Sequence, residues 1–162
     1  SLHDALPISR GVIGPLLEQS PKCFVIANRS STKADELVKV FAALAVRKEV
    51  ALKSCTLADL EDVQKTSHTF DLVINATAAG LTDESPLSEA AVMQVFTPRS
   101  FAYDMVYGKT TAFMKQALQR GARISDGLGM LVEQAADAFL LWRGAELATK
   151  IDPRAVLAKL RS

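Results

Sequence analysis

One segment of the chain gathers the side chains that bind phosphate directly after a strand-like apolar run. In 24–34, FVIANRSSTKA, the residues Asn28, Arg29, Ser30 and Lys33 follow the apolar stretch. Two cations, a hydroxyl and free helix N-terminal amides would then face one point, which favours binding of a phosphate. In a dinucleotide-binding fold an acid here reads the ribose of NAD, whereas Arg accommodates the 2′-phosphate of NADP, so the segment favours NADP. The alternative is that both cations are solvated and a serine only caps the helix.

A second segment, 71–80 with the sequence DLVINATAAG, has a pattern that is typical of one side of a ligand-binding site. Its continuous apolar run, 72–74, is typical of a strand buried on both faces. The small residues that follow leave no bulky side chain above the carboxyl end of that strand. Because ligands of open α/β sheets bind outside the carboxyl ends of the strands, we expect one to lie here. An ordinary strand-to-helix loop is the alternative.

Strand-like runs alternate with helical patterns along the chain, which predicts an α/β fold with a mostly parallel sheet. Helices are expected at about 9–19, 32–44, 57–63, 88–95, 111–120, 128–143 and from Pro153 onward, and strands at about 22–27, 50–53, 71–75, 100–104 and 123–125. The apolar residues Phe139, Leu140 and Trp142 are interpreted as helix packing rather than as a cofactor site.

Composition places the chain among globular domains and excludes several classes of partner. With 162 residues, 49% hydrophobic and 23% charged, it is long enough for one domain with a real core. The net charge of +1 and the scattered basic residues argue against nucleic acid. No apolar run approaches the roughly 20 residues that span a bilayer, so we expect a cytoplasmic protein without membrane contact. Cys23 and Cys55 show no CxxC spacing and His68 is isolated, so no metal site is expected.

Four motifs together resemble the NADP-binding domain of the shikimate dehydrogenase family. They are NRSSTKA, NATAAG, YDMVYGK and DGLGMLVEQAADAFLLWRG, in the family's order and spacing, and the resemblance runs from Ser9 to about Arg161. It implies a Rossmann-like doubly wound parallel sheet and reversible hydride transfer between NADPH and 3-dehydroshikimate, giving shikimate for chorismate and aromatic amino-acid biosynthesis. The alternatives are an NAD-using quinate/shikimate dehydrogenase, which should carry an acid in place of Arg29, and a non-catalytic nucleotide-binding or interaction module.

The resemblance also implies roles for individual residues. Those expected to contact the cofactor are Asn28, Arg29, Ser30 and Lys33 at the 2′-phosphate, Thr77 at its central part, and Met105, through its backbone, and Gly127 beside the nicotinamide. A side chain at the last position would collide with the nicotinamide ring. Tyr107 and Gln134 would hydrogen-bond the small-molecule substrate, shikimate or 3-dehydroshikimate. The alternatives are a surface aromatic for Tyr107 and a solvated helix position for Gln134.

Parts of the family pattern are not found in this sequence. The family has a substrate domain with the catalytic Lys and Asp, then a first strand with a glycine-rich loop. We therefore expect 9–162 to be a partial NADP-binding domain that holds no catalytic residue and is inactive alone. In the doubly wound order 3-2-1-4-5-6, the first strand would lie between the strands at 22–27 and 71–75. Residues 1–8, SLHDALPI, resemble no part of the family and are interpreted as a non-native, adapter-derived segment, the alternative being a divergent amino terminus.

Overall fold

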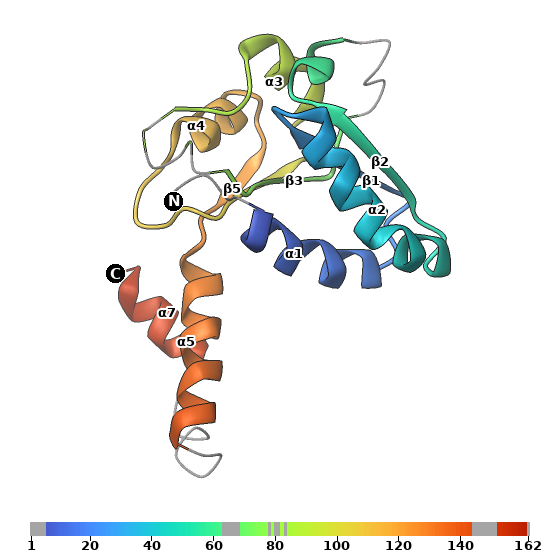
Figure 1. Ribbon diagram of the computed structural model, residues 1–162. Coiled ribbons are helices and arrows are strands. Elements are labelled where there is room, and N and C mark those ends of the chain that lie inside the picture. The colour runs from blue at the N-terminus through green and yellow to red at the C-terminus, as the bar shows by residue number, and fades with distance from the viewer. Residues whose placement is uncertain are drawn as a thin grey trace.

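The fold alternates helices with parallel strands, as the sequence predicts (Figure 1). The computed structural model describes residues 6–62, 69–77, 79, 82, 84–143 and 152–161. The first five residues of the segment interpreted as non-native, His68, and Ala78 and Gly80 of the NATAAG motif lie outside these ranges. The strands are β1 (Cys23–Asn28), β2 (Ala51–Thr56), β3 (Leu72–Asn75), β4 (Phe101–Asp104) and β5 (Arg123–Ser125). The helices are α1 (Leu6–Glu18), α2 (Ser31–Arg47), the 3-10 helix η1 (Ala58–Glu61), α3 (Glu89–Val95), α4 (Ala112–Gln119), α5 (Leu128–Arg143) and α7 (Pro153–Leu160).

The strands form two parallel sheets with a gap between them. β1 pairs with β2 over six residues, from Cys23 opposite Ala51 to Asn28 opposite Thr56. The other sheet has the order β3-β4-β5. Together they follow the doubly wound order 3-2-1-4-5-6 with its central position open, because no strand within the described ranges lies between β1 and β3. This arrangement agrees with the predicted fold lacking its first strand.

Two apolar clusters form the core. One joins α1 and α2 to β1 and β2, with Leu17 and Leu37 almost fully buried. The other joins η1, α3 and α4 to β3, β4 and β5, and its rings Phe96 and Phe113 meet edge to face with centroids 5.6 Å apart. Neighbouring β1 residues contribute to different clusters, since Ile26 lies in the first and Ala27 packs against the second. This alternation of side chains is the reason that helices cover the sheet from both sides.

Helix ends follow local capping chemistry. Ser30, Ser88, Thr111 and Asp152 cap α2, α3, α4 and α7 through side-chain oxygens that accept a backbone N–H. Gly121, which directly follows α4 and its C-cap, has a φ of 77° that only glycine adopts without strain.

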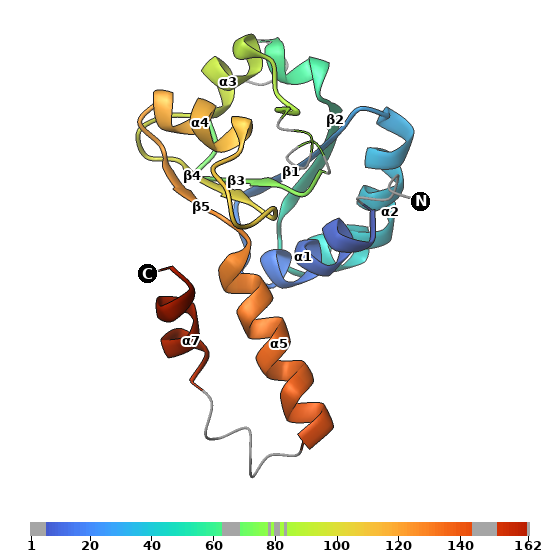
Figure 2. The ribbon, with the colours of Figure 1, turned by 90° about the vertical axis from the view of Figure 1, so that its left-hand side faces the viewer.

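Helices α5 and α7 project together from the rest of the molecule (Figure 2). They pack against each other, and only part of α5 is covered, so Leu141 and Trp142 near its end remain more than four-fifths exposed. The interpretation of Trp142 as a packed residue of this helix is therefore wrong. The helical periodicity of the sequence predicted α5, but it could not show that only part of this helix packs against other elements.

Candidate functional site

The turn between β1 and α2 brings together the residues predicted to bind phosphate. Ser30 caps α2 by accepting a hydrogen bond from the Lys33 amide at 3.5 Å, and the Ser30 amide donates to Asn28 Oδ1 at 3.0 Å. Asn28 therefore shapes the turn, in the manner of an Asx-turn. Arg29 and Lys33 are exposed, and among the described residues neither side chain has a hydrogen-bond or ion-pair partner. Both cations are free to meet an anion.

The start of α2 adds a second attraction for an anion. The amides of Ser31 and Thr32 have no hydrogen-bond acceptor within the described structure. Such amides carry the positive end of the helix dipole. Because the hydroxyl oxygen of Ser30 accepts from the backbone, its proton is available to donate outward. The turn thus offers donors and positive charge only, which suits a phosphate dianion.

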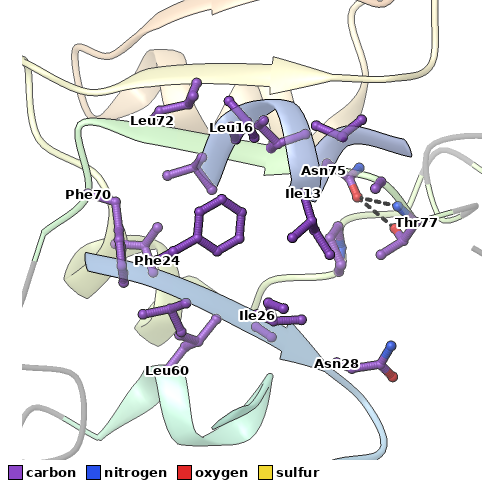
Figure 3. A pocket seen from close by; sticks show the side chains of 18 of the residues that line it. Ile13, Leu16, Phe24, Ile26, Asn28, Leu60, Phe70, Leu72, Asn75 and Thr77 are labelled. Carbon is purple, nitrogen blue, oxygen red and sulfur yellow. Dashed lines mark hydrogen bonds between the residues drawn. The ribbon is translucent and has the colours of Figure 1, made fainter. Parts of the chain in front are cut away.

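The loop after β3 is ordered by one asparagine side chain. The amide and the hydroxyl of Thr77 both donate to Asn75 Oδ1, at 3.0 and 2.7 Å. The Ala79 amide in turn donates to Thr77 Oγ1 at 3.3 Å. The Thr77 hydroxyl is therefore committed to a hydrogen bond inside the loop (Figure 3).

A buried polar network fixes this loop to the end of β4. Asp104, fully buried, accepts at Oδ2 from Asn75 Nδ2 at 3.1 Å and from Thr111 Oγ1 at 2.6 Å, and at Oδ1 from the Val106 amide at 3.0 Å. Asn75 and Thr111 are also buried. One carboxyl group thereby joins the ends of β3 and β4 to the cap of α4. Neither Asp104 nor Thr111 was among the residues predicted from the sequence; the signal for Asp104 was a polar residue at the end of a strand, as at Asn75.

The predicted proximity of Met105 and Gly127 is present in the structure. The Met105 amide donates to Asn75 O at 3.0 Å, and the Gly127 amide donates to Val106 O at 3.2 Å. A Cβ added at Gly127 would lie 2.1 Å from Met105 O, closer than atoms can approach. The expected reason for glycine was space for a nicotinamide ring. The structure gives a more direct reason, because the Met105 backbone itself fills that space.

Tyr107 and Gln134 lie on different elements of the structure. Tyr107 is half exposed in the loop after β4, and Gln134 is exposed on α5. No hydrogen bond within the described ranges joins either side chain to the other site residues. The structure places Tyr107 next to Gly108, whose amide donates to Asp126 Oδ2 at 3.3 Å. Their predicted contacts with substrate stay predictions.

Asp126 holds the loop after β4 against the start of α5. Besides Gly108, it contacts the Leu128 amide at 3.4 Å and pairs with Arg161 of the chain segment after α7 at 3.1 Å. Burial raises the pKa of the nearby Tyr103 phenol, and the charge of Asp126 raises it further. Tyr103 therefore stays neutral at physiological pH. Asp126 was missed by the sequence analysis, although its position just before Gly127 and α5 is typical of a capping acid.

These features define a class of protein. The site residues follow the carboxyl ends of β1, β3, β4 and β5 in a doubly wound parallel sheet, which is the architecture of Rossmann-like nucleotide-binding domains. No helix in the described ranges has the length and apolar character needed to cross a membrane. Within the same ranges, no three His, Cys, Asp or Glu side chains gather in a way that could hold a metal ion.

Comparison with known proteins shows one particular family to which the chain is similar. Residues 127–156 match the Shikimate 5'-dehydrogenase C-terminal domain. The chain is 48% identical over 155 residues to the shikimate dehydrogenase (NADP(+)) of Herminiimonas arsenicoxydans, and 46% identical over 157 residues to that of Dechloromonas aromatica. Each match covers 95% of this chain but only 50% and 51% of the two relatives. The chain is homologous to the C-terminal half of shikimate dehydrogenases, and it spans about half the length of the curated relatives it matches.

Solved structures agree with the sequence relatives. The shikimate 5-dehydrogenase of Thermus thermophilus, in complex with NADP(H) and shikimate, superposes with a TM-score of 0.71 at 28% identity, over 97% of this chain and 52% of that one. The quinate dehydrogenase of Corynebacterium glutamicum, in complex with NAD, has a TM-score of 0.73 at 23% identity, over 97% and 52% of the two chains. The second similarity shows the fold alone. The predicted Rossmann-like fold and family resemblance are thus confirmed.

Proposed function

We propose that this chain is the NADP-binding part of a shikimate dehydrogenase, which reduces 3-dehydroshikimate to shikimate with NADPH in cytoplasmic chorismate and aromatic amino-acid biosynthesis. One observation carries the choice of cofactor: Arg29 and Lys33 flank the start of α2 with no acid between Asn28 and Lys33. An acid would repel a 2′-phosphate, whereas Arg suits one. The names and ligands of the relatives support the same assignment.

The residues present fit NADP. Arg29, Lys33, the Ser30 hydroxyl and the first amides of α2 supply only donors and positive charge to a phosphate. The central part of the cofactor would lie near Thr77, in the loop held by Asn75. The backbone of Met105, packed on Gly127, would form the wall beside the nicotinamide.

When bound, NADPH supplies the hydride. This chain's own residues bind and orient: the exposed side chains of Tyr107 and Gln134 would hydrogen-bond a substrate with hydroxyls and a carboxylate. The Asp104 network holds the loops after β3 and β4 in one arrangement, which fixes the distance between cofactor and substrate positions. We propose that the proton donor to the new hydroxyl is the family's Lys, outside these residues.

A chimeric enzyme tests the proposal. Residues 9–162 replace the matched half of the Herminiimonas arsenicoxydans relative, and NADPH oxidation is followed with 3-dehydroshikimate. The proposal predicts turnover with NADPH and 3-dehydroshikimate well above that with NADH. A folded chimera that prefers NADH and quinate would support the quinate/shikimate alternative, and one that binds nucleotide without turnover would support the non-catalytic module.

A further inference from the structure

Both peptide groups that flank Tyr107 are hydrogen-bonded to the residues just before α5. The Val106 carbonyl, in the peptide group before Tyr107, accepts from the Gly127 amide at 3.2 Å. The Gly108 amide, in the peptide group after Tyr107, donates to Asp126 Oδ2 at 3.3 Å. Because each peptide group is planar, holding both of them holds the φ and ψ angles of Tyr107, and with these angles the direction in which its side chain leaves the backbone.

The orientation of the Asp126 carboxylate decides whether the Gly108 amide keeps its acceptor. The other oxygen of this carboxylate, Oδ1, accepts from the Leu128 amide at 3.4 Å and from Arg161 Nη2 at 3.1 Å. The Arg161 contact is the shortest of these three and joins opposite charges, whereas both amide contacts are long for hydrogen bonds. Arg161 is therefore the strongest of the three restraints on the Asp126 side chain.

Helix α7 brings Arg161 to this carboxylate. Leu157 of α7 lies against Gly129 of α5, where an added Cβ would be 3.8 Å from a Leu157 methyl carbon. Arg161 follows Leu157 by four residues and its amide donates to Leu157 O at 3.2 Å, so both residues lie on the same face of the helix. The end of α7 accordingly lies beside the start of α5 (Figures 1 and 2). The apolar contact places the helix, and the guanidinium of Arg161 then meets Asp126.

We propose that Arg161 is a positioning residue for the substrate: by pairing with Asp126 it holds the peptide group after Tyr107, and so keeps the Tyr107 phenol pointing in one direction. This inference rests on the proposed function, in which the Tyr107 hydroxyl hydrogen-bonds 3-dehydroshikimate. Arg161 acts in this role only through Asp126 and the loop after β4. The side chains of Arg161 and Asp126 are 50% and 19% exposed, so the effect of the pair is modest, a few-fold in binding.

A purely structural role for this ion pair is the alternative. An ion pair that only anchored α7 to α5 would stabilise the fold and would affect the binding of cofactor and substrate alike. The described contacts already give α7 another anchor, since Leu157 packs against Gly129. The two roles differ in what the loss of Arg161 changes: an anchor predicts a general loss, whereas the positioning role predicts a loss that depends on Tyr107.

Amide hydrogen exchange of the 162-residue chain, resolved to single residues by NMR, tests whether Arg161 holds the loop. Arg161→Ala should speed exchange at Gly108 about two- to fivefold, the range expected for an exposed ion pair. The control Arg154→Ala removes an exposed cation at the start of α7, whose side chain has no hydrogen-bond or ion-pair partner in the part of the chain that the structure describes, and should leave this rate unchanged. No effect of Arg161→Ala, or an equal effect of the two changes, would overturn the proposal.

Steady-state kinetics of the chimera test the consequence for the substrate. Arg161→Ala should raise the KM for 3-dehydroshikimate about two- to fivefold and leave the KM for NADPH unchanged. Arg161→Lys keeps the charge without the planar fork of Arg, and should restore part of the loss. In a chimera that already carries Tyr107→Phe, Arg161→Ala should have no further effect, because the hydroxyl that Arg161 positions is gone.

The outcomes separate this proposal from the proposed function. An equal effect of Arg161→Ala with and without the Tyr107 hydroxyl, or a matching rise in the KM for NADPH, would show an anchor and overturn the positioning role. An unsubstituted chimera that does not turn over 3-dehydroshikimate would contradict the proposed function and the substrate role together. Exchange at Gly108 would still decide whether Arg161 holds the loop.

Discussion

Replacing Asp104 with Asn should destabilise the enzyme although the two side chains have nearly the same shape. Asp104 accepts three hydrogen bonds, two at Oδ2 from Asn75 and Thr111 and one at Oδ1 from Val106. An Asn has one oxygen and one NH₂. If the new NH₂ takes the place of Oδ2, the buried Asn75 amide loses its acceptor and faces another donor; if it takes the place of Oδ1, the half-buried Val106 amide does.

The size of the effect follows from these contacts. A buried donor left unpaired costs about 1–3 kcal/mol, and the exchange of a charged acceptor for a neutral one weakens the remaining bonds by roughly 1 kcal/mol. We expect the free energy of unfolding to fall by about 2–4 kcal/mol. Because Asn75 also holds the Thr77 loop, the KM for NADPH should rise as well.

Urea denaturation of the chimera, with activity measured on the same preparations, provides the assay. Asp71→Asn is the control, since Asp71 is an exposed acid at the opposite end of the β3–β4 ladder and should change stability by less than about 0.5 kcal/mol. A loss below about 1 kcal/mol for Asp104→Asn, or an equal loss in the control, would refute the reasoning.

Three further predictions concern single residues of the chimera. Gly127→Ala should lower the free energy of unfolding in urea by about 3 kcal/mol, because its Cβ meets the Met105 carbonyl. The control Gly11→Ala has open space around its Cβ and should raise the free energy of unfolding slightly, and equal effects of the two changes would contradict the packing argument. Tyr107→Phe should lower kcat/KM for 3-dehydroshikimate and leave NADPH affinity unchanged, and the reverse pattern would show that the assignment is wrong. Burial raises the pKa of the Cys55 thiol, so iodoacetamide should label this thiol at pH 8 more slowly than a thiol of ordinary pKa. The labelling rate should increase as the pH rises. Labelling of Cys55 at the rate found in the unfolded chain would contradict this prediction.

Sequence patterns predicted the elements well where local chemistry decides them. The capping serine Ser30 and the periodic apolar face fixed α2, and the start of α7 at Pro153 matched the preference of Pro for that position. Long-range pairing decided the rest. β2 runs to Thr56, beyond the predicted 50–53, because each of its residues pairs with β1. Helix α1 begins at Leu6, three residues before the expected start.

The candidate site was predicted less completely than the fold. Arg29 and Lys33 were found because both follow one strand within a single helical turn, so sequence spacing alone places them together. Asp104 was missed because its partners Asn75 and Thr111 come from other elements, 29 and 7 residues away. A single sequence shows which residues end strands, but it does not show which of those ends hydrogen-bond one another.

The discrimination between NADPH and NADH by Arg29→Ala tests the central claim most directly. Removal of this exposed cation from the chimera should raise the KM for NADPH about tenfold, because a charge-assisted hydrogen bond to phosphate is lost, and leave the KM for NADH unchanged. The control Arg99→Ala removes an exposed cation at the amino-terminal end of β4, away from α2, and should change neither constant. Equal losses with both cofactors, or no loss with NADPH, would contradict the assignment of this site to the 2′-phosphate of NADP.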